Sequence, residues 1–191
     1  MRGPQPYCLC EPRNAFLFAP PLPGPTAKAS MDLSYSAAQE ADLEDNICLL
    51  RRHLLSHTTA TAALAAWCER RGIGSGPIQT SVLQRAVSSR GARDVGYRRV
   101  KLLRGDAVLS FAEIRYRCDV LNPAMTRTLE QTKSPFGEVV APLDPRRVTT
   151  FARFCADPLA EIVLFHHATV LDRCGRPIAR VRESYQGVLV A

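Results

Sequence analysis

Arg98 and Glu183 are the two residues whose surroundings in the sequence most favour chemistry. Each lies in a predicted strand, on the face that otherwise carries apolar side chains. These apolar neighbours are Val100 and Leu102 in the first strand and Ala179, Val181 and Tyr185 in the second. An arginine on such a face can hold a carboxylate through two parallel hydrogen bonds, and a glutamate can accept a hydrogen bond from a hydroxyl.

The pattern leaves two interpretations of Arg98 and Glu183 open. A charge on an apolar face costs several kcal/mol unless it is paired or bound to a ligand. In the structural interpretation, the two residues form a buried ion pair or lie at sheet edges. In the functional interpretation, both line a ligand cavity between a sheet and its covering helices. A different pair, His53 and His57, has the spacing of metal ligands on a helix, but no third ligand is evident, so no metal site is predicted.

Two helices are predicted before the first strand. Ser36 to Gln39 has the pattern of a capping box, and apolar residues then repeat at helical spacing. These repeating residues are Leu43, Ile47, Leu50 and Leu54. A second helix follows Thr58 or Thr59 and ends at Gly72, because glycine is favoured just after a helix.

The rest of the chain predicts strands joined mostly by hairpins. The predicted strands are 78–87, 98–102, 108–118, 147–155, 161–171 and 177–190. One short helix is predicted at 124–131, opened by Asn122 and Pro123. Helices first and hairpin-connected strands afterwards are typical of an α+β fold. We therefore expect an antiparallel β-sheet of about six strands, covered on one face by helices.

The first 33 residues differ in composition from the remainder. Seven of the 14 prolines fall within the first 30 residues, and the apolar residues there follow no period. The sequence predicts a disordered Pro-rich tail over residues 1–33 and one folded domain over 34–191. Met31 is a candidate alternative start of translation.

The net charge of +7 restricts the partners that we expect. The arginines are scattered among acidic residues, and no Lys/Arg block is interleaved with aromatic residues as in proteins that stack bases. We therefore expect no nucleic-acid partner. The excess charge indicates either a solvated basic surface or a pocket for a small anionic metabolite.

The cysteines and apolar runs bear on compartment. Seven cysteines, an odd number at irregular spacing, indicate reduced thiols and a cytoplasmic protein. No apolar run is long enough for a signal peptide or a membrane span, so no membrane partner is predicted.

The order of several short motifs resembles the chorismate lyase family. The stretch 97–106 resembles the segment that carries the family's substrate-binding arginine, and 133–137 resembles its Lys-Thr-Pro-Leu-Gly turn. The hairpin at 175–177 and Glu183 resemble its last strand and active-site glutamate. The resemblance covers about half of the chain, and UTRA domains, the effector-binding halves of some bacterial repressors, share this fold.

The resemblance implies a function and a set of site residues. Chorismate lyase eliminates pyruvate from chorismate to give 4-hydroxybenzoate, the entry step of ubiquinone biosynthesis, without a metal or cofactor. Arg98 matches the arginine that holds the ring carboxylate, and Glu183 matches the catalytic glutamate. Backbone amides at the start of the second helix, at Thr59, Ala60 and Thr61, are expected to help bind a carboxylate, because a helix N-terminus favours anions.

One position departs from the family pattern. Where the family has a second arginine in the return strand, this chain has Glu113, which we expect beside the substrate. An acid there disfavours a dianionic ligand. The alternative function is therefore a non-catalytic, UTRA-like domain that binds a small anionic or aromatic carboxylate metabolite.

Overall fold

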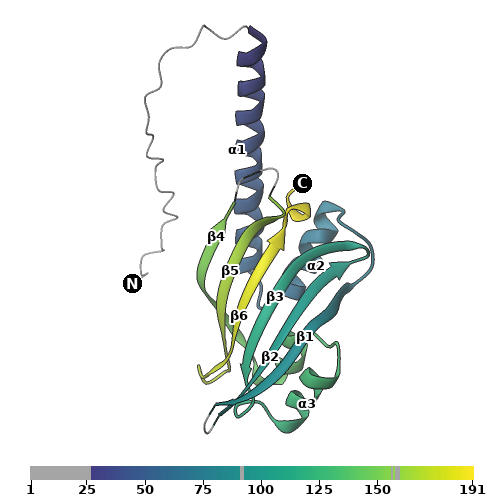
Figure 1. The fold of residues 1–191 in the computed structure, drawn as a ribbon, viewed down its shortest axis with the longest axis vertical. Helices are drawn as coiled ribbons and strands as arrows, with labels where there is room; N and C mark the ends of the chain where they lie inside the picture. Colours follow the sequence, from purple (N-terminus) through teal and green to yellow (C-terminus); the bar gives the residue numbers. More distant parts are fainter. Residues whose placement is uncertain (1–26, 91–92, 156, 158–159) are drawn as a thin grey trace.

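The computed structural model describes residues 27–90, 93–155, 157 and 160–191 (Figure 1). Four α-helices are present in this part of the chain: α1 (Ala27–Leu55), α2 (Ala60–Arg71), α3 (Pro123–Gln131) and α4 (Phe136–Val140). The six strands are β1 (Ile78–Arg90), β2 (Arg93–Arg104), β3 (Ala107–Arg117), β4 (Arg146–Phe154), β5 (Ile162–Leu171) and β6 (Pro177–Gln186). Two short 3₁₀ helices, Ala141–Leu143 and Gly187–Leu189, complete the described elements.

The predicted α+β class and the six-stranded antiparallel sheet are confirmed. The strand order is β1-β2-β3-β6-β5-β4, and every neighbouring pair is antiparallel. The sheet therefore consists of two three-stranded hairpin units that meet where β3 pairs with β6. Gly105 and Gly175 supply the positive φ angles, 57° and 78°, that the β2–β3 and β5–β6 turns need.

Helix ends follow the predicted capping signals in α2 and α3. The hydroxyl of Thr59 accepts from the Ala62 amide at 3.2 Å, and Gly72 ends α2 with φ 67°. Asn122 caps α3 in the same way, accepting from the Met125 amide at 2.8 Å.

Several predicted boundaries differ from the structure, among them the start of α1 and the end of β6. Helix α1 begins at Ala27 rather than at Ser36, and its first turns include several alanines, which have the highest helix propensity. The predicted tail thus falls partly on residues 1–26, which lie outside the described residues, and partly on α1. The last strand ends at Gln186, because the Gly187 amide donates to the Glu161 carbonyl and the chain turns into a 3₁₀ helix.

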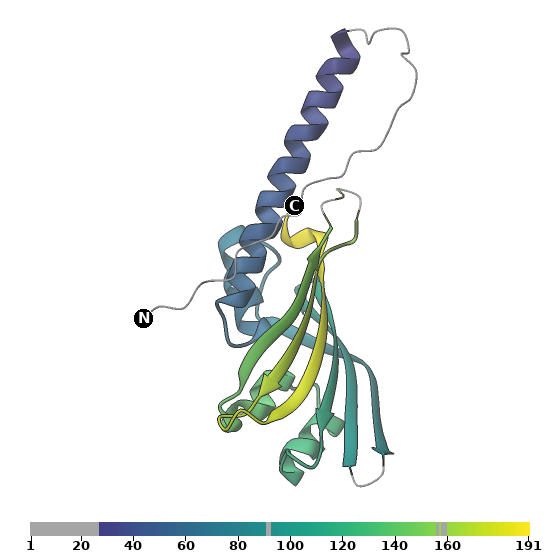
Figure 2. The same cartoon turned by 90° about the vertical axis from the view of Figure 1, so that its left-hand side faces the viewer.

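All four helices lie on one face of the sheet, and the other face is left without a helix in the described part of the chain (Figure 2). Side chains of α1 and α2 pack with one end of the sheet, where the Trp67 indole donates to the Leu189 carbonyl at 2.8 Å. Side chains of α3 and α4, among them Leu129 and Phe136, pack with the other end. None of the helices described is both long enough and apolar enough to cross a lipid bilayer.

Candidate functional site

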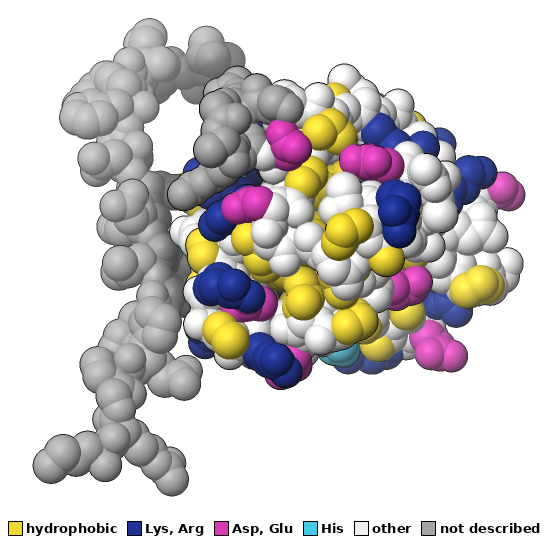
Figure 3. All heavy atoms as spheres, turned by 90° about the horizontal axis from the view of Figure 1, so that it is seen from below, with side chains coloured by type: hydrophobic (Ala, Val, Ile, Leu, Met, Phe, Trp, Pro, Cys, Tyr) yellow, Lys and Arg dark blue, Asp and Glu magenta, His cyan; other side chains and the backbone are white. Residues whose placement is uncertain are grey.

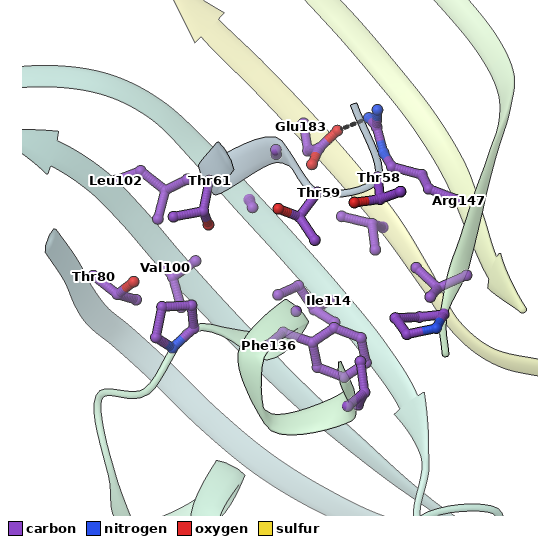
Figure 4. Close-up of a pocket in the computed structure, with 18 residues that line it drawn as sticks. Thr58, Thr59, Thr61, Thr80, Val100, Leu102, Ile114, Phe136, Arg147 and Glu183 are labelled. Atoms are coloured by element: carbon purple, nitrogen blue, oxygen red, sulfur yellow. Dashed lines mark hydrogen bonds and ion pairs between the residues drawn. The ribbon is translucent and has the colours of Figure 1, made fainter. Parts of the chain in front are cut away.

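A cavity lies between the covered face of the sheet and the helices, where the two packing regions meet (Figure 4). Its floor is apolar and comes from β2, β3, β5 and β6. The apolar floor residues are Val100, Leu102, Ala112, Ile114, Val170 and Val181. The start of α2, from Thr58 to Thr61, forms one wall, and α4, with Phe136 and Gly137, forms another.

One buried ion pair stands in this apolar cavity. Arg147 donates from Nη2 to Glu183 Oε2, and both side chains are almost fully buried, at 8% and 7% exposure. The hydroxyl of Tyr185 donates to the same carboxylate oxygen at 3.0 Å. Burial lowers the pKa of Arg147, but the charges of Glu183 and Tyr185 and the hydrogen bonds to them together outweigh burial, so the pKa of Arg147 is raised. Burial, and then the charge of Glu183, raises the pKa of Tyr185 well above its usual range. Arg147 therefore keeps its positive charge, and Tyr185 is neutral at physiological pH.

His166, on β5, lies behind the ion pair, on the same face of the sheet as Arg147 and Glu183. Its ring is fully buried and packs edge-on against Tyr185, with ring centroids 5.4 Å apart. Its Nδ1 lies 3.5 Å from Arg147 Nη2. Burial, and then the charges of Arg147 and Arg51, lowers the pKa of His166 to about 4. The imidazole is thus neutral at pH 7. His167, its neighbour in sequence, points to the opposite face, as the strand period predicts.

The start of α2 faces the cavity, as predicted for Thr59, Ala60 and Thr61. The first amides of a helix have no partners within the helix and carry partial positive charge. Gly137 of α4 allows close approach here, because a Cβ on this residue would lie 3.1 Å from the Thr59 methyl carbon. The hydroxyl of Thr80, on β1, is buried at the cavity and has no hydrogen-bond partner among the described residues.

Arg98 occupies a different position from the one expected. It is 1% exposed and donates from Nη1 to the Ser134 carbonyl at 2.9 Å and from Nη2 to the Thr132 carbonyl at 3.0 Å. It is not among the residues that line the cavity. Burial, and then the charge of Arg85, lowers the pKa of Arg98. Arg98 therefore holds the loop between α3 and α4, and the ion pair considered between Arg98 and Glu183 is not formed.

Glu113 also lies away from the cavity. Its neighbours in β3, Ala112 and Ile114, line the cavity, so the alternation of the strand turns Glu113 to the opposite face. There it pairs in register with Arg99 of β2 and Arg182 of β6. The expectation that Glu113 lies beside a ligand of this cavity is corrected by this placement.

Arg147 was not singled out by the sequence. It stands next to Arg146 at the start of an edge strand, where adjacent charges and a mixed pattern indicate neither face. The cross-strand pairing with Val170 turns Arg147 inward. The strand period gives no clear signal either, because a register shift between Thr149 and Phe151 puts Ala152 on the face of Arg147 and leaves Phe151 exposed.

Comparisons with known proteins support the fold. No protein-family model matches the chain. A curated protein of Sinorhizobium fredii, described as uncharacterized protein y4mC, is 29% identical over 171 residues, which cover 71% of each chain. The crystal structure of PhnF from Mycobacterium smegmatis is 12% identical, with a TM-score of 0.50, and the match covers 69% of this chain and 64% of PhnF. A separate structure of the effector domain of PhnF matches 68% of this chain and 89% of that domain, at 12% identity and a TM-score of 0.47.

The likeness to full-length PhnF shows a shared fold, of the UTRA and chorismate lyase type predicted from the sequence motifs. The chain spans less than two thirds of that solved protein.

The buried ion pair generates a stability prediction. Glu183→Leu leaves Arg147 charged and unpaired, so the free energy of unfolding should fall by about 3 kcal/mol or more. The double variant Arg147→Met/Glu183→Leu should be more stable than Glu183→Leu alone, because it removes both charges from the apolar cavity. Urea unfolding of the wild type and the variants measures this coupling. Tyr185→Phe, which removes one hydrogen bond to the pair, is the control and should lose only about 1 kcal/mol. Additive losses in the double variant would contradict the pairing.

His166 generates a pH prediction. Its pKa is about 4 in the folded chain and about 6.5 in the unfolded chain. The unfolded chain therefore binds a proton first as the pH falls, and the folded state loses stability between pH 6.5 and 4. At pH 5 the contribution of His166 should be about 2 kcal/mol less favourable than at pH 7. Urea unfolding at the two pH values should show a smaller loss for His166→Leu than for the wild type, and an equal loss in both would contradict a depressed pKa.

Proposed function

We propose that this chain binds a small anionic metabolite with an aromatic or otherwise apolar body and does not transform it. The observation that carries the proposal is the meeting of an apolar floor, a helix N-terminus and unsatisfied polar groups in one cavity. The α2 amides favour a carboxylate. The apolar side chains of the cavity floor, among them Val100 and Val181, suit an aromatic ring.

Two buried polar groups at the cavity support a ligand with oxygen atoms. The Thr80 hydroxyl and Arg147 Nε are buried and have no hydrogen-bond partner among the described residues. Buried polar groups are normally satisfied, so orphaned groups at a cavity are positions where a ligand oxygen, or a water, would bind. The carboxylate of Glu183 accepts hydrogen bonds and would bind a ligand hydroxyl. A hydroxylated aromatic carboxylate such as 4-hydroxybenzoate has this arrangement of groups.

The likeness to PhnF supports binding over catalysis. The part of PhnF that was also solved separately is described as its effector domain. By that analogy the ligand of this chain would act as a signal for a regulatory partner or segment. The analogy rests on fold, which does not fix function on its own, and the chemistry of the cavity carries the argument.

Ligand binding predicts a thermal shift. 4-Hydroxybenzoate at about 100 times its Kd should stabilise the folded chain by about 2.7 kcal/mol and raise its Tm. Ala112→Leu, which fills the cavity floor, should abolish the shift. Thr80→Val should weaken binding by about fivefold, because it removes a single hydrogen bond to the ligand.

The matched control is Thr126→Val, on α3 and outside the cavity, which should leave the shift unchanged. 4-Hydroxybenzyl alcohol, which lacks the carboxylate, should give no shift. A full shift with Ala112→Leu, or with the uncharged alcohol, would refute binding of an aromatic carboxylate in this cavity.

Chorismate lyase activity is the second candidate function. Glu183, which matches the family's catalytic glutamate, lines the cavity, and this favours the activity. Against it, the guanidinium of Arg98 already donates to two loop carbonyls, and the carboxylate of Glu183 is neutralised by Arg147.

We expect the purified chain to produce no 4-hydroxybenzoate from chorismate above the spontaneous rate, measured by chromatography over a time course. The Glu183→Gln variant is the control for any product that does form. Product made by the wild type and lost in Glu183→Gln would establish the lyase activity and overturn the non-catalytic proposal.

A further inference from the structure

The face of the sheet that carries no helix presents an ordered array of side chains across β2, β3, β6, β5 and β4. The register places them in three rows that cross these five strands. The central row is Arg99, Glu113, Arg182, His167 and Phe151. The rows on either side are Tyr97, Arg115, Arg180, Thr169 and Val148, and Lys101, Phe111, Ser184, Phe165 and Arg153. We call these fifteen positions the outer array.

The outer array is strongly basic. Its cations are Arg99, Lys101, Arg115, Arg153, Arg180 and Arg182, and all of these except the half-buried Lys101 are exposed. Glu113 is its only acid. Six cations to one acid contrasts with 25 to 18 in the whole chain, so positive charge is concentrated here beyond the average composition. The end of the molecule seen in Figure 3, by contrast, mixes both signs of charge.

Four aromatic rings lie among these cations. Tyr97, Phe111, Phe165 and Phe151 occupy the outer array on four different strands. Phe151 is 48% exposed, and its ring contacts that of His167 with centroids 5.1 Å apart. The described helices all lie on the other face, so none of them covers these rings (Figures 1 and 2). Phe151 is exposed, and Tyr97, Phe111 and Phe165 are half-buried. Rings with accessible surface among arginines can stack on flat partners while the arginines pair with anionic groups.

The linear sequence led us to expect no nucleic-acid partner, because the rings and cations come together only across strands. From their placement in the sheet we propose that the outer array binds single-stranded nucleic acid. The cations would pair with successive phosphates, and the rings would stack on unpaired bases. Neighbouring strands lie about 4.8 Å apart, so the five strands span about 19 Å, enough for several nucleotides.

Other occupants fit the outer array less well. A second copy of the chain would bring like charges together. A duplex offers phosphates but hides the faces of its bases, so the aromatic rings would have no base on which to stack. An acidic peptide or an anionic membrane would use the arginines without needing the rings among the cations. Because the cavity lies on the opposite face, this proposal does not depend on the proposed ligand.

Binding is tested with the full chain and fluorescently labelled oligo(dT) and oligo(U) of about 12 nucleotides, by anisotropy over about 50 to 200 mM salt. Arg99→Ala/Arg182→Ala should weaken binding at least about tenfold and reduce the slope of log Kd against log salt by about 1.4, for two lost phosphate contacts. Phe151→Ala should weaken binding about tenfold with an unchanged salt slope, because stacking carries no counterion.

The matched control is Arg127→Ala/Lys133→Ala, which removes two exposed cations from the α3 region on the other face and should change Kd by less than about twofold. Thermal unfolding of each variant verifies that it is folded. Absence of binding at the lowest salt would overturn the proposal. So would equal loss in the control, wild-type affinity in Phe151→Ala, or equal competition by duplex DNA, polyglutamate or phosphatidylserine vesicles.

Discussion

The pairing of β3 with β6 is the contact on which the rest of this structure depends. Without it the sheet would be two separate three-stranded units, and both apolar core clusters, each of which draws side chains from the two units, would be divided. The pairing sets Ala112 beside Glu183 on the inner face and Glu113 beside Arg182 on the outer face. One ladder of backbone hydrogen bonds therefore builds both the floor of the cavity and the middle of the basic array.

The inner face shows how a charge can be kept in an apolar layer. Arg147 and Glu183 face each other across β5, and Tyr185 completes the hydrogen bonding of one carboxylate oxygen. His166 remains neutral behind them, first because burial disfavours its charged form and then because Arg147 would repel a second positive charge. The cavity thus keeps a balanced charge while its α2 wall remains positive. For the ligand that we propose, this balance would favour a monoanion over a dianion.

Much of the fold could be predicted because its signals are local. The alternation in β2, β3 and β6 identified the buried faces, and the caps at Thr59, Gly72 and Asn122 marked helix ends. Burial of Arg98 and Glu183 followed from the same alternation. The partners of these two residues could not be predicted. The carbonyls of Thr132 and Ser134 reach Arg98, and Arg147 reaches Glu183, only through tertiary packing. The basic array was equally hidden: its rings and cations interleave across strands, whereas along the chain they are far apart.

The hold of Arg98 on the loop between α3 and α4 has a consequence for how variants of this chain are interpreted. Pro135, Phe136 and Gly137, which line the cavity, follow directly after the two carbonyls that Arg98 binds. Loss of the guanidinium would free that loop and let a wall of the cavity shift. Such a variant would show impaired ligand affinity with no contact to the ligand, so a scan that scores affinity alone would assign Arg98 to the binding site. Only a measurement that reports the position of the loop separately from the occupancy of the cavity would show whether Arg98 supports the loop or contacts the ligand.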